Sequence, residues 1–214
     1  MISKLEKIYS ILDQETKNFN VPVIDLIKLH TNDPYKVLIA TILSARTKDE
    51  VTKKAAERLF VNAKNFKELS EIKEKEIEKL IFPVGFYKTK AKHLRQVGAL
   101  MVGKYGGKMP MTLPGLLELP GVGRKTANLV LAVAFNEDAI CVDTHVQRIF
   151  NRLGLIKTKT PFETEKALQK LLPKKYWKKT NQYFVALGQN VCKPISPKCN
   201  ICKIARYCEK IIKS

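Results

Sequence analysis

Hydrophobic residues recur at intervals of three and four along nearly the whole chain, which is the spacing of a helix with one buried face. The first such stretch covers residues 1–18, where the apolar positions are Leu5, Ile8, Tyr9 and Leu12. No segment of useful length alternates apolar and polar residues, as a half-buried strand would. The pattern therefore predicts an all-α protein whose first helix is amphipathic.

Two further stretches, 37–45 and 126–135, are apolar on almost every face. A helix that is hydrophobic all round is buried in a core. Asp33 and Pro34 precede the first stretch. Asp33 is a suitable N-cap residue, and Pro34 would occupy the first helical position, where proline is favoured. We expect both stretches to form central, buried helices.

Breaks between helices place a few unusual residues in loops. Thr47 and Glu50 have the spacing of a capping box, which predicts that a new helix begins there. Arg46 then lies in a short break between two helices. A second break at 82–87 contains Phe86, a large apolar residue in a loop.

The charge of the chain is strongly positive, with 39 Lys and Arg against 20 Asp and Glu, a net charge of +19. Such a surplus indicates an anionic partner, nucleic acid first and a membrane surface second, although a lysine-rich proteome gives the same composition. No apolar run reaches the length of a membrane span, and the N-terminus resembles an ordinary helix more than a targeting peptide. We therefore expect a cytoplasmic, nucleoid-associated protein.

Four of the five cysteines lie in one short segment with the spacing C-x6-C-x2-C-x5-C, namely Cys192, Cys199, Cys202 and Cys208. In a reducing compartment, clustered cysteines are better metal ligands than disulfide partners. Zinc and a [4Fe–4S] cluster both accept four cysteines, and this spacing differs from the short paired knuckles of most zinc sites. The segment predicts a metal centre and favours iron–sulfur over zinc.

Lysines are interleaved with these cysteines, including Lys193 and Lys198. Fixed cations on a tightly held loop suit contact with phosphates, although each lysine alone is also compatible with a solvated surface charge. Cys141 stands apart in an apolar run and is expected to be a core residue.

The run Leu-Pro-Gly-Val-Gly-Arg-Lys at 119–125 lies between two helix signals. Gly121, Val122 and Gly123 would form a tight turn whose backbone N–H groups face outward at the start of the next helix, where a phosphate can bind. This is a helix–hairpin–helix, which grips the DNA backbone. Lys125 follows, where the helix dipole and the neighbouring arginine lower a lysine pKa and favour a nucleophilic amine. The alternative is a surface lysine that binds phosphate.

Asp143 precedes an amphipathic helix at 146–153. An aspartate at this position is common as an N-cap for structural reasons alone. A capping carboxylate stays ionised, however, so the same residue could stabilise positive charge on a sugar. His145 is either part of the same site or simply a polar residue of that helix.

Together these motifs resemble endonuclease III of the helix–hairpin–helix glycosylase superfamily, and the resemblance covers nearly the whole chain. It rests on the run 119–128, on Val142-Asp-Thr-His145 with Arg148, on the cysteine spacing, on Leu43-Ser44-Ala45 with Asp49, and on Gly85-Phe86-Tyr87 with Lys90.

The resemblance implies two all-α domains with the active site in the cleft between them. A six-helix domain would cover residues 27–137, and a cluster domain would combine 1–26 with 138–214. It also implies a [4Fe–4S] cluster, a catalytic Lys125 and a catalytic Asp143. The residues expected to contact double-stranded DNA are Gly121, Val122, Gly123, Arg46, Phe86, His145, Arg148, Lys193 and Lys198.

The implied activity is that of a monomeric, bifunctional DNA glycosylase and AP lyase. A damaged base, in this family usually an oxidised pyrimidine such as thymine glycol, is flipped out of the duplex. Lys125 attacks C1′ of the sugar and displaces the base, and β-elimination then cuts the strand on the 3′ side. Asp143 would stabilise the cationic sugar.

Two residues depart from the well-known bacterial pattern. That pattern has Gln at the position of Arg46, which is expected to fill the gap left by the flipped base, and Leu at the position of Phe86, the expected wedge.

Two other functions compete with the one implied. A monofunctional adenine or mismatch-thymine glycosylase would lack a lysine at position 125. A non-catalytic DNA-binding protein would need neither Lys125 nor Asp143.

Overall fold

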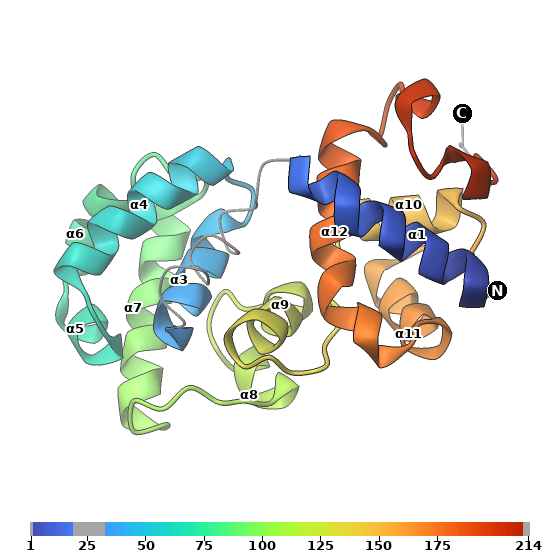
Figure 1. Cartoon of the computed structure of the whole chain (residues 1–214). Helices are drawn as coiled ribbons and strands as arrows, with labels where there is room; N and C mark the ends of the chain where they lie inside the picture. Colours follow the sequence, from blue (N-terminus) through green and yellow to red (C-terminus); the bar gives the residue numbers. More distant parts are fainter. Residues whose placement is uncertain (1, 19–32, 212–214) are drawn as a thin grey trace. The chain divides into compact units, whose positions relative to one another are not determined.

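The computed structural model describes residues 2–18 and 33–211, and all regular secondary structure in these ranges is helical (Figure 1). This confirms the predicted all-α class. The described residues fall into two compact units, one formed by 33–137 and the other by 2–18 together with 138–211. The domain boundary expected at residues 26 and 27 lies outside the described residues.

The unit 33–137 is built around one buried helix. Its helices are α3 (Pro34–Ser44), α4 (Asp49–Asn62), α5 (Phe66–Glu71), α6 (Glu74–Ile81), α7 (Tyr87–Gly103), α8 (Leu113–Leu117) and α9 (Arg124–Ala134). Helix α3 packs against α4, α7 and α9, and every residue from Val37 to Leu43 is buried. Asp33 caps this helix by accepting a hydrogen bond from the Tyr35 backbone N–H at 2.9 Å. The predicted central helix and its N-cap are both confirmed.

The other unit joins the N-terminal helix to the C-terminal half of the chain. Its helices are α1 (Ile2–Glu15), η1 (Thr16–Asn18), α10 (Thr144–Arg152), α11 (Pro161–Leu171), η2 (Lys174–Tyr176), α12 (Trp177–Asn190), η3 (Cys199–Ile201) and η4 (Ala205–Tyr207). The four apolar residues predicted for the inner face of α1 are buried in one core with residues of α10 and α12. Tyr9 adds a hydrogen bond of 2.7 Å to the Thr180 hydroxyl. The amphipathic helix α1 thus packs against the C-terminal half of the chain.

Side-chain caps differ between two helix starts of the chain. Thr160 caps α11, because its hydroxyl accepts from the Glu163 N–H at 3.1 Å. The box at Thr47 and Glu50 is wrong, since α4 begins at Asp49 with Lys48 at its N-cap and no side-chain cap. The reason is a competing partner, because the Thr47 hydroxyl accepts instead from the Gly85 N–H, far along the chain.

In the described part of the chain, each helix is too short or too polar to cross a membrane.

Candidate active site and nucleic-acid interface

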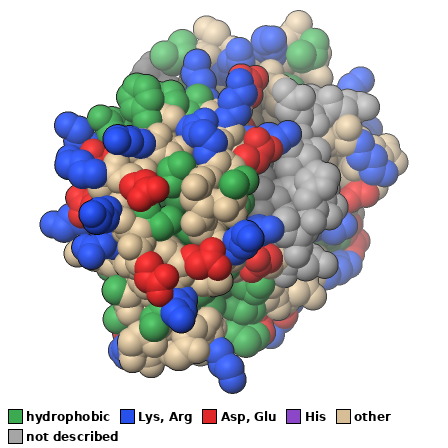
Figure 2. All heavy atoms as spheres, turned by 90° about the vertical axis from the view of Figure 1, so that its left-hand side faces the viewer, with side chains coloured by type: hydrophobic (Ala, Val, Ile, Leu, Met, Phe, Trp, Pro, Cys, Tyr) green, Lys and Arg blue, Asp and Glu red, His purple; other side chains and the backbone are tan. Residues whose placement is uncertain are grey.

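Positive charge is distributed unevenly within the unit 33–137. The segment 49–81, which forms α4, α5 and α6, has eight Lys and Arg against eight Asp and Glu, whereas 82–136 has eight against one. Figure 2 views the molecule from the side of α4, α5 and α6, and basic and acidic side chains are interspersed there. The side suited to a polyanion is therefore the part of this unit that α7, α8 and α9 form.

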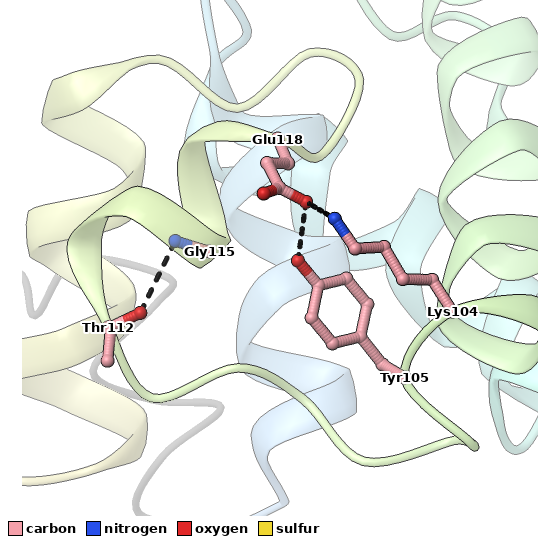
Figure 3. A network of polar contacts seen from close by, with 5 residues as sticks. All are labelled: Lys104, Tyr105, Thr112, Gly115 and Glu118. Carbon is pink, nitrogen blue, oxygen red and sulfur yellow. Dashed lines mark hydrogen bonds and ion pairs between the residues drawn. The ribbon is translucent and has the colours of Figure 1, made fainter.

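The first helix of the predicted hairpin is fixed to the end of α7. Glu118, just after α8, accepts hydrogen bonds from the Lys104 ammonium at 2.5 Å and from the Tyr105 hydroxyl at 2.7 Å (Figure 3). At the other end of α8, the Thr112 hydroxyl accepts from the Gly115 N–H at 3.3 Å and caps the helix. The short helix is thus held at both ends by polar contacts.

The turn that follows is a helix–hairpin–helix, as predicted. Gly121 has a φ of +78°, and a Cβ on it would lie 2.7 Å from the His93 ring nitrogen, so both backbone and packing require glycine here. Val122 is buried and its N–H bonds to the Leu119 carbonyl at 3.0 Å. Gly123 is the N-cap of α9, and a Cβ on it would meet no atom within 4 Å. The space in front of the helix start is open.

Lys125 is the second residue of α9, and its side chain is exposed. The helix behind it is buried at Ala127, Asn128 and Val130, as predicted for this apolar stretch. The amine therefore projects from a rigid, well-packed helix directly after the hairpin. Its role as a nucleophile stays a prediction.

Arg46 and Phe86 lie in separate loops, and the structure brings them together. The guanidinium carbon of Arg46 is 5.6 Å from the centre of the Phe86 ring, within the range of a cation–π contact. Both residues have left-handed backbone conformations, with φ of 53° and 58°. Non-glycine residues rarely adopt this conformation without a structural reason.

Lys90 is a functional candidate that the sequence analysis quoted only as part of a motif. Its side chain is 7% exposed, and its ammonium donates to the carbonyls of Leu43 and Ala45 at 2.7 and 2.6 Å. Burial lowers the pKa of this amine to about 8. A helical pattern could have found it, because Lys90, Leu94 and Val97 lie on one face at intervals of four and three residues.

In the other unit, Asp143 is the N-cap of α10, as predicted. One carboxylate oxygen accepts from the backbone N–H groups of His145 and Val146 at 2.9 and 3.0 Å. These two hydrogen bonds fix the position of a negative charge at the helix start. A structural aspartate would make the same two contacts, so a catalytic role for Asp143 stays a prediction.

The structure brings His145 and Arg148 together, and it joins them to the cysteine segment. The Arg148 guanidinium lies 3.0 Å from the His145 ring nitrogen and donates to the Cys192 carbonyl at 2.8 Å. Gly188 makes room for this pair, since a Cβ there would lie 2.3 Å from the same ring nitrogen. The start of α10 is therefore packed onto the residue that begins the cysteine segment. DNA contact by these two residues stays a prediction.

The four cysteines of the segment line one small cavity of about 30 Å³. All are partly buried, and none of the five cysteines, each of which is described, forms a disulfide. Within residues 2–18 and 33–211, however, no group of three or more His, Cys, Asp or Glu side chains is placed to hold a single metal ion. The identity of a metal centre at these cysteines stays a prediction. Cys141 is buried, as expected for a core residue.

Arg152 holds the loop between the first two cysteines, and sequence analysis missed it. This buried arginine donates to the Cys192 sulfur at 3.3 Å, the Lys193 carbonyl at 2.7 Å and the Pro194 carbonyl at 2.7 Å. The loop is closed by a backbone hydrogen bond of 3.0 Å from Lys198 to Val191. Lys193 and Lys198 themselves are exposed, as phosphate contacts require. The only signal for Arg152 was a basic residue on the buried face of an amphipathic helix.

Comparison with known proteins identifies the protein family that the chain resembles. The family described as "HhH-GPD superfamily base excision DNA repair protein" matches residues 39–174. Endonuclease III of Thermotoga maritima is 49% identical over 177 residues, which is 83% of each chain. Endonuclease III homolog 2, chloroplastic, of Arabidopsis thaliana is 45% identical over 188 residues, which is 84% of this chain and 49% of that longer protein.

A solved structure gives the same result. The one described as "Structure of a Trapped Endonuclease III-DNA Covalent Intermediate: Estranged-Adenine Complex" matches with a TM-score of 0.84 and 33% identity, covering 98% of this chain and 97% of the other. The chain therefore belongs to the endonuclease III family of the HhH-GPD superfamily.

Proposed function

We propose that this chain removes damaged bases from duplex DNA and then cuts the strand, as a base excision repair glycosylase with AP lyase activity. The observation that carries the proposal is Lys125, an exposed amine on the first turn of the helix that follows the hairpin. The family supports it, since one solved relative is a trapped covalent intermediate with DNA. A glycosylase that uses only water would have no need of an amine at this position.

The hairpin would bind the phosphate backbone without reading sequence. Gly123 brings no side chain to the start of α9 and has open space in front of it. The positive end of the helix dipole and its N–H groups can then face a phosphate. Lys193 and Lys198, exposed on the closed cysteine loop, would add sequence-independent phosphate contacts.

Lys125 would act as the nucleophile. Its neutral amine bonds to C1′ of the damaged nucleotide while the bond from C1′ to the base breaks and the base leaves with a proton. The C1′–O4′ bond then breaks as O4′ takes a proton, which opens the sugar ring and leaves a protonated imine between C1′ and the lysine nitrogen. This imine acidifies a C2′ proton, and loss of that proton breaks the C3′–O3′ bond, which cuts the strand with the 3′ phosphate as leaving group. The side chain is exposed, so desolvation of the amine has to come from the bound DNA.

Asp143 would stabilise the positive charge that develops on the sugar as the base leaves. Two backbone N–H donors orient its carboxylate before any substrate binds. A preorganised charge of this kind costs no reorganisation during the reaction. We infer that capping and catalysis use the same carboxylate, because the oxygen that caps the helix also fixes the orientation of the whole group.

The four cysteines would hold a [4Fe–4S] cluster. The residues present fit this group, because all four cysteines line one cavity and four thiolates are the ligands that such a cluster takes. The cluster would supply a structural anchor for the loop that carries Lys193 and Lys198, and no step above depends on it. Anaerobically purified protein should contain about four iron and four sulfide per chain. Stoichiometric zinc without iron would overturn this assignment.

Oxidised pyrimidines are the proposed substrates, as is usual in the family, and the protein would act where the chromosome is. The activity is tested by incubating the protein with duplexes that each carry one lesion and adding borohydride, which reduces the imine to a stable adduct. A covalent adduct with a thymine glycol duplex and none with undamaged DNA is expected. Tight binding without any adduct or strand cleavage at an abasic site would favour the non-catalytic alternative.

A further inference from the structure

The hairpin turn rests on a histidine of α7, a helix that is not part of the hairpin motif. A Cβ on Gly121 would lie 2.7 Å from the Nδ1 atom of His93 and 3.2 Å from its Cγ atom. The imidazole therefore occupies space that the side chain of any other residue at position 121 would need. The ring and the turn are in direct contact, although they lie far apart in the sequence.

His93 has no polar partner in the part of the chain that the structure describes. Its side chain is only partly buried, and within residues 2–18 and 33–211 its ring nitrogens make no hydrogen bond and no ion pair. Both nitrogens remain accessible, because the one fully buried, unpartnered side-chain nitrogen or oxygen in these ranges is Nε of Arg148. An imidazole carries at least one N–H donor in either protonation state. A leucine could fill the same space, so packing alone does not account for a residue with an unused donor.

The surroundings of His93 suit an anion. The segment 82–136 contains one acidic residue, Glu118, whose carboxylate is already hydrogen-bonded to the end of α7 (Figure 3). Close to His93 on α7, Lys92 and Arg95 are both exposed. An anion at the turn therefore meets cations and N–H donors from this segment, and the carboxylate of the segment is occupied elsewhere.

We propose that His93 is a phosphate ligand of the hairpin, and that its ring donates a hydrogen bond to the phosphate that binds at the start of α9. The proposal rests on the proposed function in one respect, that the hairpin binds the DNA backbone, and it needs no step of the chemistry. Gly123 leaves room for the phosphate, and the helix dipole supplies about half a positive charge. A donor from α7 adds a hydrogen bond to a charged acceptor, which is stronger than one between neutral groups.

Three substitutions at position 93 separate a hydrogen-bond donor from a packing side chain. His93→Leu still packs against Gly121 but has no donor. An asparagine amide reaches about as far as Nδ1 of the imidazole and a glutamine amide about as far as Nε2, so His93→Asn and His93→Gln each restore a donor at one ring position. Thermal melting checks that each variant folds, and His93→Ala replaces His93→Leu if the latter does not.

Affinity is measured on a duplex with a tetrahydrofuran abasic analogue, which cannot form an imine, so that only binding is observed. His93→Leu should bind roughly tenfold more weakly than wild type, the scale of one hydrogen bond to a charged group. One of the two amide variants should recover most of that loss. Wild-type affinity in the folded leucine variant would refute the ligand role. Equal losses in all three variants would also refute it, because the ring would then only support the turn.

The contacted phosphate is identified by a double-mutant cycle between protein and DNA. A methylphosphonate replaces one phosphate at a time, which removes its charge and one of its oxygens. The phosphate that the hairpin binds is the one where the losses from Gly123→Ala and from the methylphosphonate do not add. At that phosphate the losses from His93→Leu should fall short of additive by roughly tenfold, and at more distant phosphates they should add. Additive losses at every phosphate would refute the proposal.

Lys92→Leu is the matched control, because it removes an exposed cation from the neighbouring position of the same helix. Its losses should be close to additive at the phosphate that couples to His93. Equal coupling in both variants would indicate a general effect of charge on α7 and would refute a specific ligand. A protein that shows the His93 coupling but forms no borohydride adduct would lose the proposed chemistry and keep this ligand, and the opposite pair of results would have the opposite meaning.

Discussion

The starts of α9 and α10 solve the same structural problem in opposite ways. Each helix leaves backbone N–H groups at its N-terminus that its own turns do not satisfy. At α10, the Asp143 carboxylate accepts from two of them, so a negative charge of the protein closes the helix. At α9, the N-cap is Gly123, which has no side chain, and a Cβ on it would meet no atom within 4 Å. The start of α10, capped by Asp143, is called the closed end below. The start of α9, at Gly123, has no capping side chain and leaves room for an external anion, and it is called the open end.

This difference matches two different tasks. A closed end fixes one negative charge relative to the backbone, which is what stabilisation of a cationic sugar needs. An open end presents dipole and N–H groups to a phosphate, which is what a sequence-independent grip needs. Lys125, the second residue of α9, then lies next to the place where the phosphate would bind. The predictions below test whether the two ends have these separate roles.

The largest effect is expected at the open end, for Lys125→Gln. Removal of the amine should abolish the borohydride adduct altogether, because no other residue is proposed to form the imine. Affinity for an abasic-analogue duplex should fall by less than about tenfold, since one cation contributes a small part of the total. Trapping gels and binding titrations measure the two effects. An adduct that persists in the Gln variant would show that Lys125 is a phosphate contact only.

At the closed end, Asp143→Asn separates charge from capping. The amide oxygen can still accept from His145 and Val146, so thermal stability should change by less than about 1 kcal/mol. Base excision should nevertheless fall by roughly 10²–10³, because the fixed charge is gone. Single-turnover excision and thermal melting give the two numbers.

The companion variant at this position is Asp143→Ala, which loses the cap as well. It should be less stable than Asp143→Asn by about 1 kcal/mol, with excision reduced to a similar degree. Normal excision in the Asn variant would show that Asp143 is structural only, and α10 would then be closed for stability alone.

The sequence could predict both ends because each depends on local chemistry. The positions of Asp143 and Gly123 at helix starts were predicted from their residue type and from the helix pattern that follows them. The hairpin, the helix caps and the buried helices were predicted from the same kind of local signal. The Thr47 capping box failed because a partner far along the chain uses the hydroxyl. The helical pattern places Lys90 and Arg152 on buried faces, but their acceptors are backbone carbonyls of other segments, and no sequence motif encodes those partners. The pairing of Arg46 with Phe86 likewise depends on tertiary contact.

The two hairpin glycines give a matched test of the open end, with a smaller effect. Gly123→Ala should leave stability nearly unchanged, because its φ of −88° suits any residue and the new Cβ meets nothing. It should weaken DNA binding several-fold, since the methyl group occupies the approach of the phosphate. Gly121→Ala should instead destabilise the fold by about 1 kcal/mol or more, given its φ of +78° and the nearby His93 ring. Equal affinity of wild type and Gly123→Ala for duplex DNA would mean that the phosphate binds elsewhere.

The smallest effect is expected in the salt dependence of binding, and it distinguishes the two ends most directly. Each phosphate neutralised by a full cation adds about 0.9 to the slope of log affinity against log salt concentration. Lys125→Gln should therefore reduce the slope by up to about 0.9. Gly123→Ala should reduce it by about half as much or less, because a helix terminus carries about half a positive charge. Asp143→Asn should leave the slope unchanged, since a closed end contacts no phosphate. Binding titrations at four or five salt concentrations, on one abasic-analogue duplex, suffice to rank the three variants. A reduced slope in Asp143→Asn would mean that the start of α10 also meets the backbone of the DNA, and the division between an open and a closed helix end would be wrong.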